Sequence, residues 1–421
     1  MLFCFRNPVV AHEIGRKIQA VNQRLVDLEK RSCRFGFITQ AINSSGHYAN
    51  KSTNPCSDGN RTTGPAFIQS EIVGDKVEES KKQLIDLLIK KVSTQEGSSG
   101  SNNVAVAAAI TGAGGIGKTT LARMVFNDAT VVEKFDKTVW LSINKEVNEI
   151  ILLRRAVAAF GGDYGGLAAD KALLEHALKQ VVRQKKFLLA MDDVWSDKVW
   201  NELLRVPLND GASGSQVLVT TRNDRVARMM KAQHLHRVDK LETQDAWALL
   251  KRQVVLNESD EADVDNLKDI GIKIVEKCDG LPLAVKVLGG RLLNTSRTRG
   301  AWVDVSNHLT WSMEGMDYDI NKAVYLSYEE LPSHLKQCFL FCSLFPKDES
   351  ITRGVISQLW IAEGYIHNKL SSKPPEDLAF EYYKELISRN LLEPVEEYYD
   401  QSAFTMHDVV RSFAQYIYNK R

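Results

Sequence analysis

A glycine-rich segment, Gly112–Thr119, carries the clearest chemical signal in the chain. It reads Gly-Ala-Gly-Gly-Ile-Gly-Lys-Thr and fits the pattern G-x-x-x-x-G-K-[ST] of a phosphate-binding loop in full. Glycines lack the Cβ atoms that would keep a backbone away from a polyphosphate, so backbone N–H groups can donate to its oxygens. We expect Lys118 to reach the β- and γ-phosphates and Thr119 to be a ligand of Mg²⁺. The expected phosphate-binding residues are Gly112, Gly114, Gly115, Ile116, Gly117, Lys118, Thr119 and Thr120.

The residues on either side of this segment fit such a loop. Val104–Thr111 is a short apolar run, typical of a strand buried on both faces, and Leu121–Phe126 reads as a helix. The loop would then lead from a buried strand into a helix N-terminus, whose dipole favours anions. An ordinary glycine turn is the alternative, and the context on both sides argues against it.

Two carboxylates follow a second apolar run. Phe187–Met191 predicts a buried strand, and Asp192 and Asp193 come directly after it. In phosphate-loop proteins the first acid at this strand end holds Mg²⁺, directly or through water. We therefore expect Asp192 to join Thr119 as a metal residue, with Asp193 as the candidate catalytic residue that polarises an attacking water. A plain loop start would also place two acids here.

An arginine ends a third apolar run. Gln216–Thr221 predicts a strand, and Arg222 follows it. From the carboxyl edge of the same sheet, its guanidinium could pair with γ-phosphate oxygens and report whether that phosphate is present. A surface arginine is the alternative, and the residue by itself does not decide between the two.

These strands alternate with helices. A further strand is expected at 138–143 and helices at about 76–91, 149–160 and 173–184, which predicts a parallel sheet sandwiched by helices. Beyond about residue 243 helical periodicity dominates, with short strand-like pieces such as 403–406.

Composition sets broad limits. The 421 residues are 44% hydrophobic and 25% charged with a net charge of +1, which predicts two to four globular domains and no nucleic-acid footprint. No apolar run approaches the ~20 residues of a membrane helix, and Arg6 comes too early for a signal peptide. The six cysteines form no C-x-x-C pair, which indicates reduced thiols inside the cell; Cys338 and Cys342 favour core packing.

The N-terminal region precedes these elements. Apolar residues from Ile14 to Leu28 are spaced by 4, 3, 4 and 3, which predicts one amphipathic helix of a small bundle. A stretch rich in Ser, Asn, Thr and Gly follows, and we interpret residues 41–69 as a linker.

The motifs stand in the order of a known family. Over about residues 70–420 the chain resembles the NB-ARC region of plant intracellular resistance receptors of the nucleotide-binding leucine-rich-repeat type, a region shared by animal apoptosis adaptors. Besides the motifs above, the series comprises Phe135–Trp140, Val219–Arg222, Gly280–Ala284, Cys338–Asp348 and Met406–Asp408. Trp195 resembles the subclass with an N-terminal coiled-coil domain, and residues 14–30 resemble the last helix of that domain.

The resemblance implies further site residues. Pro282 would touch the adenine or the sugar side of the nucleotide, although by itself it is a proline in the first turn of a helix. His407 would reach the β-phosphate of ADP. Val73, in the segment before the phosphate loop, would lie at the base. The family often has an arginine after the next glycine; Asp75 stands there instead, which puts a base contact from that position in doubt.

The implied organisation is a coiled-coil remnant at 1–40, the linker, an α/β phosphate-loop NTPase domain at 70–243, an all-α helical subdomain at 244–318 and a winged-helix-like subdomain at 319–421. The implied function is an ADP/ATP-dependent switch in plant defence, with Mg²⁺ as cofactor and at most slow hydrolysis. Adenine nucleotide, the receptor's own coiled-coil and leucine-rich-repeat regions and further copies in the ATP state would be partners. The resemblance also implies a cytoplasmic location, with a nuclear pool left open.

Two other classes of protein stay as alternatives. An ATP-hydrolysing motor or remodelling enzyme needs an arginine from a neighbouring subunit, for which we find no clear candidate. A small-molecule kinase would leave about 180 C-terminal residues without a role. Neither alternative explains Gly280–Ala284 together with Met406–Asp408.

Overall fold

The computed structural model describes residues 72–95, 104–143, 147–163, 170–308, 322–346, 349–366, 373–395 and 400–420. The expected helix at 14–30 and the linker at 41–69 lie outside the described residues. No helix within these ranges combines the length and the apolar character that a membrane crossing requires.

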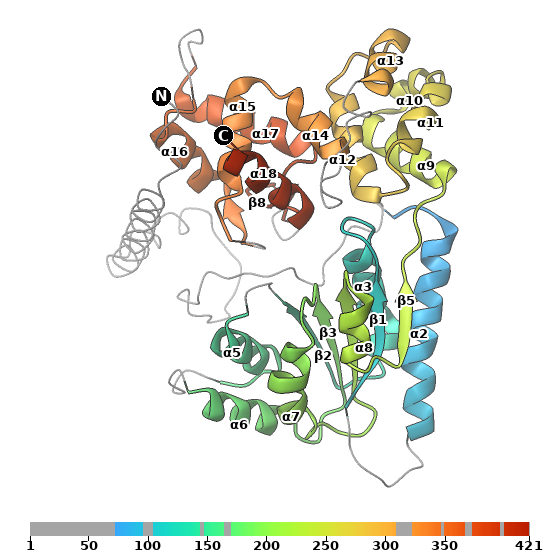
Figure 1. Ribbon diagram of the computed structural model, residues 1–421, viewed down its shortest axis with the longest axis vertical. Coiled ribbons are helices and arrows are strands. Elements are labelled where there is room, and N and C mark those ends of the chain that lie inside the picture. Colours follow the sequence, from blue (N-terminus) through green and yellow to red (C-terminus); the bar gives the residue numbers. More distant parts are fainter. Residues whose placement is uncertain are drawn as a thin grey trace, which may run out of the picture. The chain divides into compact units, whose positions relative to one another are not determined.

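A five-stranded parallel sheet forms the first part of the molecule, as the alternation of strands and helices predicted (Figure 1). The strand order is β2-β3-β4-β1-β5. Since β4 lies between β3 and β1, the segments that follow these three strands meet at one edge of the sheet. The strands are β1 (Ala105–Thr111), β2 (Lys137–Ser142), β3 (Phe187–Asp192), β4 (Gln216–Thr221) and β5 (His234–Arg237).

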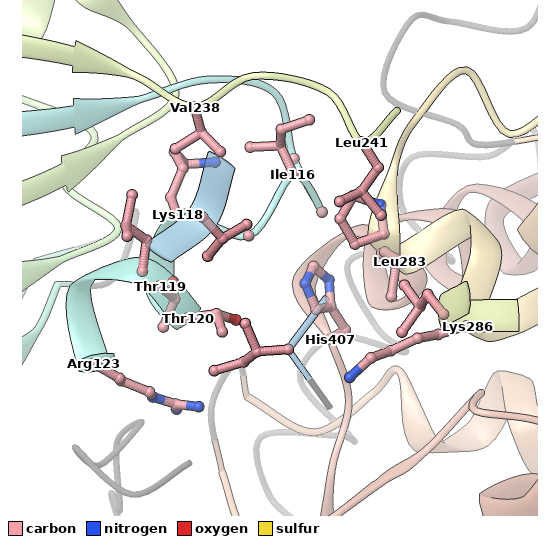
Figure 2. Close-up of a pocket in the computed structure, with 18 of the residues that line it drawn as sticks. Ile116, Lys118, Thr119, Thr120, Arg123, Val238, Leu241, Leu283, Lys286 and His407 are labelled. Atoms are coloured by element: carbon pink, nitrogen blue, oxygen red, sulfur yellow. The ribbon is translucent and has the colours of Figure 1, made fainter. Parts of the chain in front are cut away.

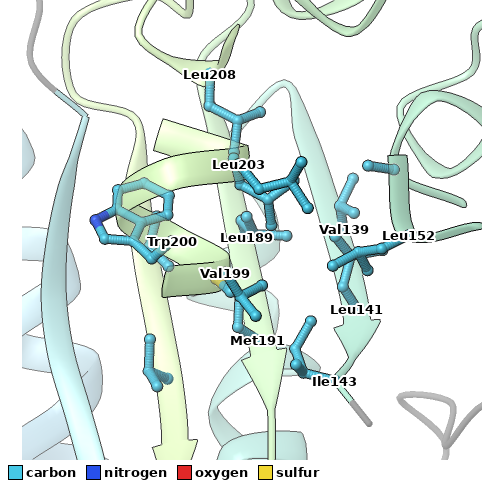
Figure 3. Close-up of a cluster of buried hydrophobic side chains, with 14 of the residues drawn as sticks. Val139, Leu141, Ile143, Leu152, Leu189, Met191, Val199, Trp200, Leu203 and Leu208 are labelled. Atoms are coloured by element: carbon cyan, nitrogen blue, oxygen red, sulfur yellow. The ribbon is translucent and has the colours of Figure 1, made fainter. Parts of the chain in front are cut away.

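Helices cover both faces of the sheet. In β3, Leu189 and Met191 contribute to one apolar cluster, whereas Leu188 and Ala190 contribute to another. The first cluster includes side chains of α5, α6 and η3. Figure 3 shows Leu189 and Met191 of β3 in this cluster together with Leu152 of α5 and Leu203 of η3. The second includes side chains of α2 and α3. The helices are α2 (Asp75–Gln95), α3 (Lys118–Phe126), α4 (Ala129–Val132), α5 (Glu149–Ala159), α6 (Lys171–Val182), the π-helix η3 (Val199–Leu204), α7 (Arg205–Leu208) and α8 (Asp224–Met229).

Local sequence explains where several of these helices begin. The side chain of Asn148 accepts a hydrogen bond from the backbone N–H of Ile151 at the start of α5, and Asp170 caps α6 in the same way. Burial then stabilises the packed helices: a fully buried large apolar side chain contributes about 1.5–3 kcal/mol, and Trp200 of η3 is such a side chain.

A group of helices follows the sheet. Their shared core contains Trp247, Ile270 and Trp302, all buried. Pro282 occupies the first turn of α12, where its missing N–H leaves no hydrogen bond unmade. The helices are α9 (Thr243–Val254), α10 (Glu258–Asp265), α11 (Lys268–Glu276), α12 (Pro282–Leu293) and α13 (Arg299–Asn307).

The C-terminal part combines helices with a small antiparallel sheet of order β6-β8-β7. Cys338 and Cys342 lie in its core, as expected, and burial raises the pKa of Cys338 to about 12. The elements are α14 (Lys322–Glu329), α15 (Ser333–Cys342), β6 (Ile351–Thr352), α16 (Arg353–Ala362), α17 (Pro375–Ser388), β7 (Glu393–Pro394), β8 (Ala403–Thr405) and α18 (Asp408–Lys420).

Helix α12 joins the helical group to the C-terminal part. A Cβ atom at Gly290 would come within 2.6 Å of Arg389 Cα, so the two backbones touch. The guanidinium of Arg291, 3% exposed, bonds to Glu330, and Asn390 donates to the carbonyl of Lys286 at 2.8 Å. Helix α14 contributes side chains to the core of the helical group and to the core of the C-terminal part, so no clean boundary separates these two parts. The domain boundaries near residues 243 and 318 stay predictions.

Candidate functional site

A cavity of about 360 Å³ lies at the carboxyl edge of the sheet. Its walls come from the phosphate loop, from α9 and α12, and from the segment Met406–Asp408 in the C-terminal part. In Figure 2, Lys118, Thr119 and Thr120 lie on one side of the cavity and Leu283 and Lys286 on the other, with His407 between them. The fold therefore brings the first and last motifs of the sequence to one place.

The loop has the backbone that its glycines predicted. Gly115 and Gly117 have φ angles of 73° and 103°, a conformation that side chains with a Cβ rarely adopt. Gly117 caps the N-terminus of α3, and a Cβ atom there would meet no atom within 4 Å. The space in front of this helix end is therefore open to a phosphate group, and the helix dipole favours an anion there.

Lys118 is held inside the loop. Its side chain is 7% exposed, and Nζ donates to the carbonyl of Ala113 at 2.7 Å. The ammonium group therefore lies across the same loop whose backbone faces the cavity. A lysine can bind phosphate oxygens from such a position, and the contact of Lys118 with the β- and γ-phosphates stays a prediction.

Thr119 and Asp192 form one hydrogen-bonded group. The Asp192 carboxylate is 2% exposed and accepts from Thr119 Oγ1 at 2.9 Å and from Thr220 Oγ1 at 2.5 Å. A hydroxyl and a carboxylate side by side on the cavity wall are oxygen ligands of the kind that Mg²⁺ prefers. The residues present thus fit Mg²⁺, whose remaining ligands would be phosphate oxygens and water.

Asp193 and Arg222 belong to a second polar group. Asp193 has a φ angle of 56° and accepts from the indole N–H of Trp195 at 3.0 Å. The Arg222 guanidinium lies 5.0 Å from the centroid of the Trp195 ring, with Nε 3.9 Å from Asp193 Oδ1. The carboxylate of Asp193 is thus engaged by these two neighbours, and its catalytic role stays a prediction.

Arg222 also contacts the C-terminal part, which the sequence did not predict. Its guanidinium forms an ion pair with the carboxylate of Asp408, the residue at which α18 begins. The pair is largely buried, so solvent screens it less than a surface pair. One charged contact therefore connects the carboxyl end of β4 with the segment that carries His407.

His407 is oriented by its neighbours in the chain. The backbone N–H of Val409 donates to Nδ1 of His407 at 3.2 Å and to Asp408 Oδ1 at 2.7 Å. Nδ1 of His407 also lies 2.9 Å from Asp408 Oδ1, so the backbone of Val409 and the carboxylate of Asp408 together orient the imidazole ring. An imidazole N–H is a hydrogen-bond donor that suits a phosphate oxygen in the cavity that His407 lines.

The segment Ile72–Lys76 closes another end of the cavity. The carbonyl of Ile72 accepts from Arg252 of α9 at 2.8 Å, and Lys76 forms an ion pair with Glu242 at 2.7 Å. Val73 and Pro282 line the cavity, and their contacts with the base and the sugar side of a nucleotide stay predictions. Sequence reasoning did not single out Arg123, Asp245, Leu283 or Lys286, which also line it.

The loop and α12 touch directly. The backbone N–H of Leu283 donates to the carbonyl of Gly115 at 3.2 Å, and a Cβ atom at Gly115 would come within 2.7 Å of Leu283 Cβ. The phosphate loop and the helix that begins at Pro282 are thus packed without a gap.

We expect Gly115→Ala to lower the melting temperature more than Gly117→Ala. Both substitutions add a Cβ at a positive φ, with a strain of about 1 kcal/mol. Only the methyl group at residue 115 would also push Leu283 away. Differential scanning fluorimetry of both variants and the wild type checks this, and equal shifts would contradict a packed contact at Leu283.

The comparison with family models decides what kind of protein carries this site. The model described as the NB-ARC domain matches residues 78–260, and the disease resistance protein winged helix domain matches residues 344–414. The chain belongs to the NB-ARC family. The expected fold class is thereby confirmed, because the parallel sheet lies in the NB-ARC match and β6–β8 lie in the winged-helix match.

Relatives of this NB-ARC chain are plant disease resistance proteins. Disease resistance protein RGA2 of Solanum bulbocastanum is 31% identical over 410 residues, which are 97% of this chain and 40% of that protein. Putative disease resistance RPP13-like protein 1 of Arabidopsis thaliana is 34% identical over 352 residues, 83% of this chain and 32% of the relative. The chain thus spans 40% or less of the length of these two relatives.

Among the solved structures to which the chain is similar is a signal transduction ATPase with numerous domains and a tetratricopeptide repeat sensor from Pyrococcus horikoshii. It is 17% identical with a TM-score of 0.47, and the match covers 86% of this chain and 44% of that one.

Proposed function

We propose that this chain is the ADP/ATP-dependent switch of a plant intracellular immune receptor, closed with ADP and opened when ATP replaces it. The observation that carries the proposal is the cavity whose walls combine the phosphate loop with Met406–Asp408. A ligand bound between two parts of a chain favours the arrangement in which both parts contact it. The plant disease resistance relatives support the setting in defence.

The loop residues would hold the phosphates in this proposal. Backbone N–H groups from Gly115 to Thr120 donate to phosphate oxygens at the start of α3, and Lys118 supplies the opposing charge. Thr119 and Asp192 would hold Mg²⁺, which neutralises phosphate charge when it is bound. His407 would donate to the β-phosphate, while Pro282 and Val73 flank the sugar and the base.

Arg222 would make the site sensitive to the third phosphate. Its guanidinium is now paired with Asp408, but it lies at the carboxyl end of β4, on the side where a γ-phosphate would lie. A γ-phosphate would compete with Asp408 for the same guanidinium, because both are anions that pair with it. Loss of this pair would release the C-terminal part. Coupling energies of this kind are about 1–3 kcal/mol, enough to change populations 5- to 150-fold.

Other partners belong to the proposal as well. Opening would free surfaces for self-oligomerisation, and the coiled-coil and leucine-rich-repeat regions of the whole receptor would set or read the state of the switch. We place the receptor in the cytoplasm, with a nuclear pool left open, and expect it to bind neither a membrane nor nucleic acid.

We expect the purified protein to hydrolyse ATP far more slowly than the ~10 s⁻¹ typical of enzymes. Asp192→Ala should abolish the Mg²⁺-dependent part, because Thr119 would lose the carboxylate beside it. Steady-state phosphate release with and without Mg²⁺ measures both effects, with Asp197→Ala as the matched control. Rapid turnover, or turnover that saturates with a small-molecule acceptor, would favour the motor or the kinase instead.

A further inference from the structure

The cavity has a charged end and an apolar end. The charged end contains Asp192, Asp193, Arg222, His407 and Asp408. At the other end lie residues of the segment before the phosphate loop and of the helical group. The same segments also contribute Lys76, Glu242 and Asp245, and the apolar residues of this end are Ile72, Val73, Val77, Leu241, Leu249 and Leu283. A nucleotide with its phosphates at the loop would place its uncharged base against these side chains.

One face of α9 borders this end of the cavity with Asp245 and Leu249. Glu242, which caps the helix, and Asp245, Leu249 and Arg252 are spaced by three, four and three residues, so they lie along one side of it. Glu242 pairs with Lys76, and Arg252 donates to the carbonyl of Ile72. Helix α9 therefore fixes the segment Ile72–Lys76 at both ends and leaves Asp245 between these two contacts.

Asp245 is the unexplained residue of this face. Its carboxylate lies against Gly74, where Oδ2 would be 2.8 Å from an added Cβ atom, and it lines the cavity. Within the described part of the chain it makes no hydrogen bond and no ion pair, although its neighbours on α9 do. Burial, with Glu242 and Asp75 nearby, raises the pKa of this carboxyl. The carboxylate is thus partly desolvated beside the cavity with no donor among the described residues in hydrogen-bond contact, which leaves it able to accept a hydrogen bond from a ligand.

We propose that Asp245 selects adenine by accepting a hydrogen bond from the 6-amino group of the base. The inference rests on the proposed function, because it takes the bound ligand to be a nucleotide. An ionised carboxylate has acceptors only, and adenine presents an N–H₂ donor at position 6. Guanine and hypoxanthine present a carbonyl oxygen there, whose lone pairs would face the negative charge. If guanine or hypoxanthine bound here, the Asp245 carboxylate and the carbonyl oxygen of the base would both lack a hydrogen-bond donor.

The test compares two ligands that differ at this position. Equilibrium dialysis would measure Kd for ADP and for inosine diphosphate on nucleotide-stripped wild type, Asp245→Asn and Asp245→Ala. The control is Asp263→Asn, an exposed acid on α10 in the same helical group. We expect the wild type and the control to prefer ADP at least about ten-fold.

Each variant has its own expected result. In Asp245→Asn the amide N–H₂ can donate to the inosine oxygen, so the preference for ADP should shrink about ten-fold or more. Asp245→Ala should bind ADP about ten-fold more weakly than the wild type does, and its Kd values for ADP and inosine diphosphate should be similar. An unchanged ADP preference in both variants would overturn the inference. A wild type that binds neither nucleotide would overturn the proposed function with it.

Thermal stability separates recognition from a structural role. Because the folded-state pKa of Asp245 is raised, protonation favours the fold, and that contribution is present at low pH and lost as pH rises through the folded-state pKa. At neutral pH the ionised carboxyl thus opposes folding. Nucleotide-free Asp245→Asn should keep or raise the melting temperature of the wild type. A lower melting temperature together with unchanged base preference would show that Asp245 only supports the fold.

Discussion

Lys118→Arg is expected to leave the purified protein without bound nucleotide. The lysine side chain is almost fully buried in the loop, and Nζ already reaches the carbonyl of Ala113. An arginine keeps the charge, but its planar guanidinium is larger and cannot take the place of a compact ammonium group. Each hydrogen bond to a charged group that is lost costs about 1.5–3 kcal/mol. That corresponds to roughly ten-fold to more than hundred-fold in Kd.

The measurement is chromatography of nucleotide extracted from equal amounts of wild type and variant. Lys134→Arg is the matched control, because Lys134 is an exposed lysine of the same α/β part of the molecule. Circular dichroism would show whether the variant is folded. Equal nucleotide content in a folded Lys118→Arg protein would rule out Gly112–Thr119 as the phosphate site.

Asp408→Val is expected to open the protein while leaving the phosphate loop intact. The substitution removes the carboxylate that pairs with Arg222 and that shares the Val409 N–H with His407. ADP should bind more weakly because the C-terminal part contributes less to the closed state. With a coupling of about 1–3 kcal/mol, the open population would rise roughly 5- to 150-fold.

Three measurements check this expectation: ADP affinity, the radius of gyration from small-angle scattering, and signalling of the full-length receptor without a pathogen ligand. Asp377→Val, an exposed acid of α17, is the control. Adding Lys118→Arg to Asp408→Val should silence the receptor again, because the open protein could no longer bind the ATP with which, in this proposal, it self-oligomerises. If Asp408→Val changes none of the three, the Arg222–Asp408 contact does not hold the closed state.

The parts that the sequence predicted well depend on short stretches of chain. The phosphate loop can be recognised in the sequence because its glycines, lysine and threonine stand at fixed positions within eight residues. The acids after β3 and the arginine after β4 follow from the rule that parallel strands end at a common edge. Strand β5 was missed because His234–Arg237 is a short edge strand whose alternating half-buried and exposed residues include two histidines.

What the sequence did not predict depends on contacts between distant segments. Nothing near Asp408 in the sequence indicates that Arg222, far away along the chain, is its partner. Asp245, an acid in the first turn of α9, was not singled out from the sequence. Its contact with Gly74, its burial and the charges around it arise only when the chain folds, so the sequence could not indicate a role for this carboxylate.

Helix α12 bears on how chimeric receptors are built. Its twelve residues span about 18 Å. The first turn bonds to the phosphate loop through Leu283, and Gly290 packs against the backbone of Arg389. No flexible side chain cushions the contact at Gly290, so a donor C-terminal part with a different backbone there would shift the helix and, with it, the loop. A breeder or engineer who exchanges modules between such receptors should therefore transfer α12 together with the segment around Arg389, rather than cut between them.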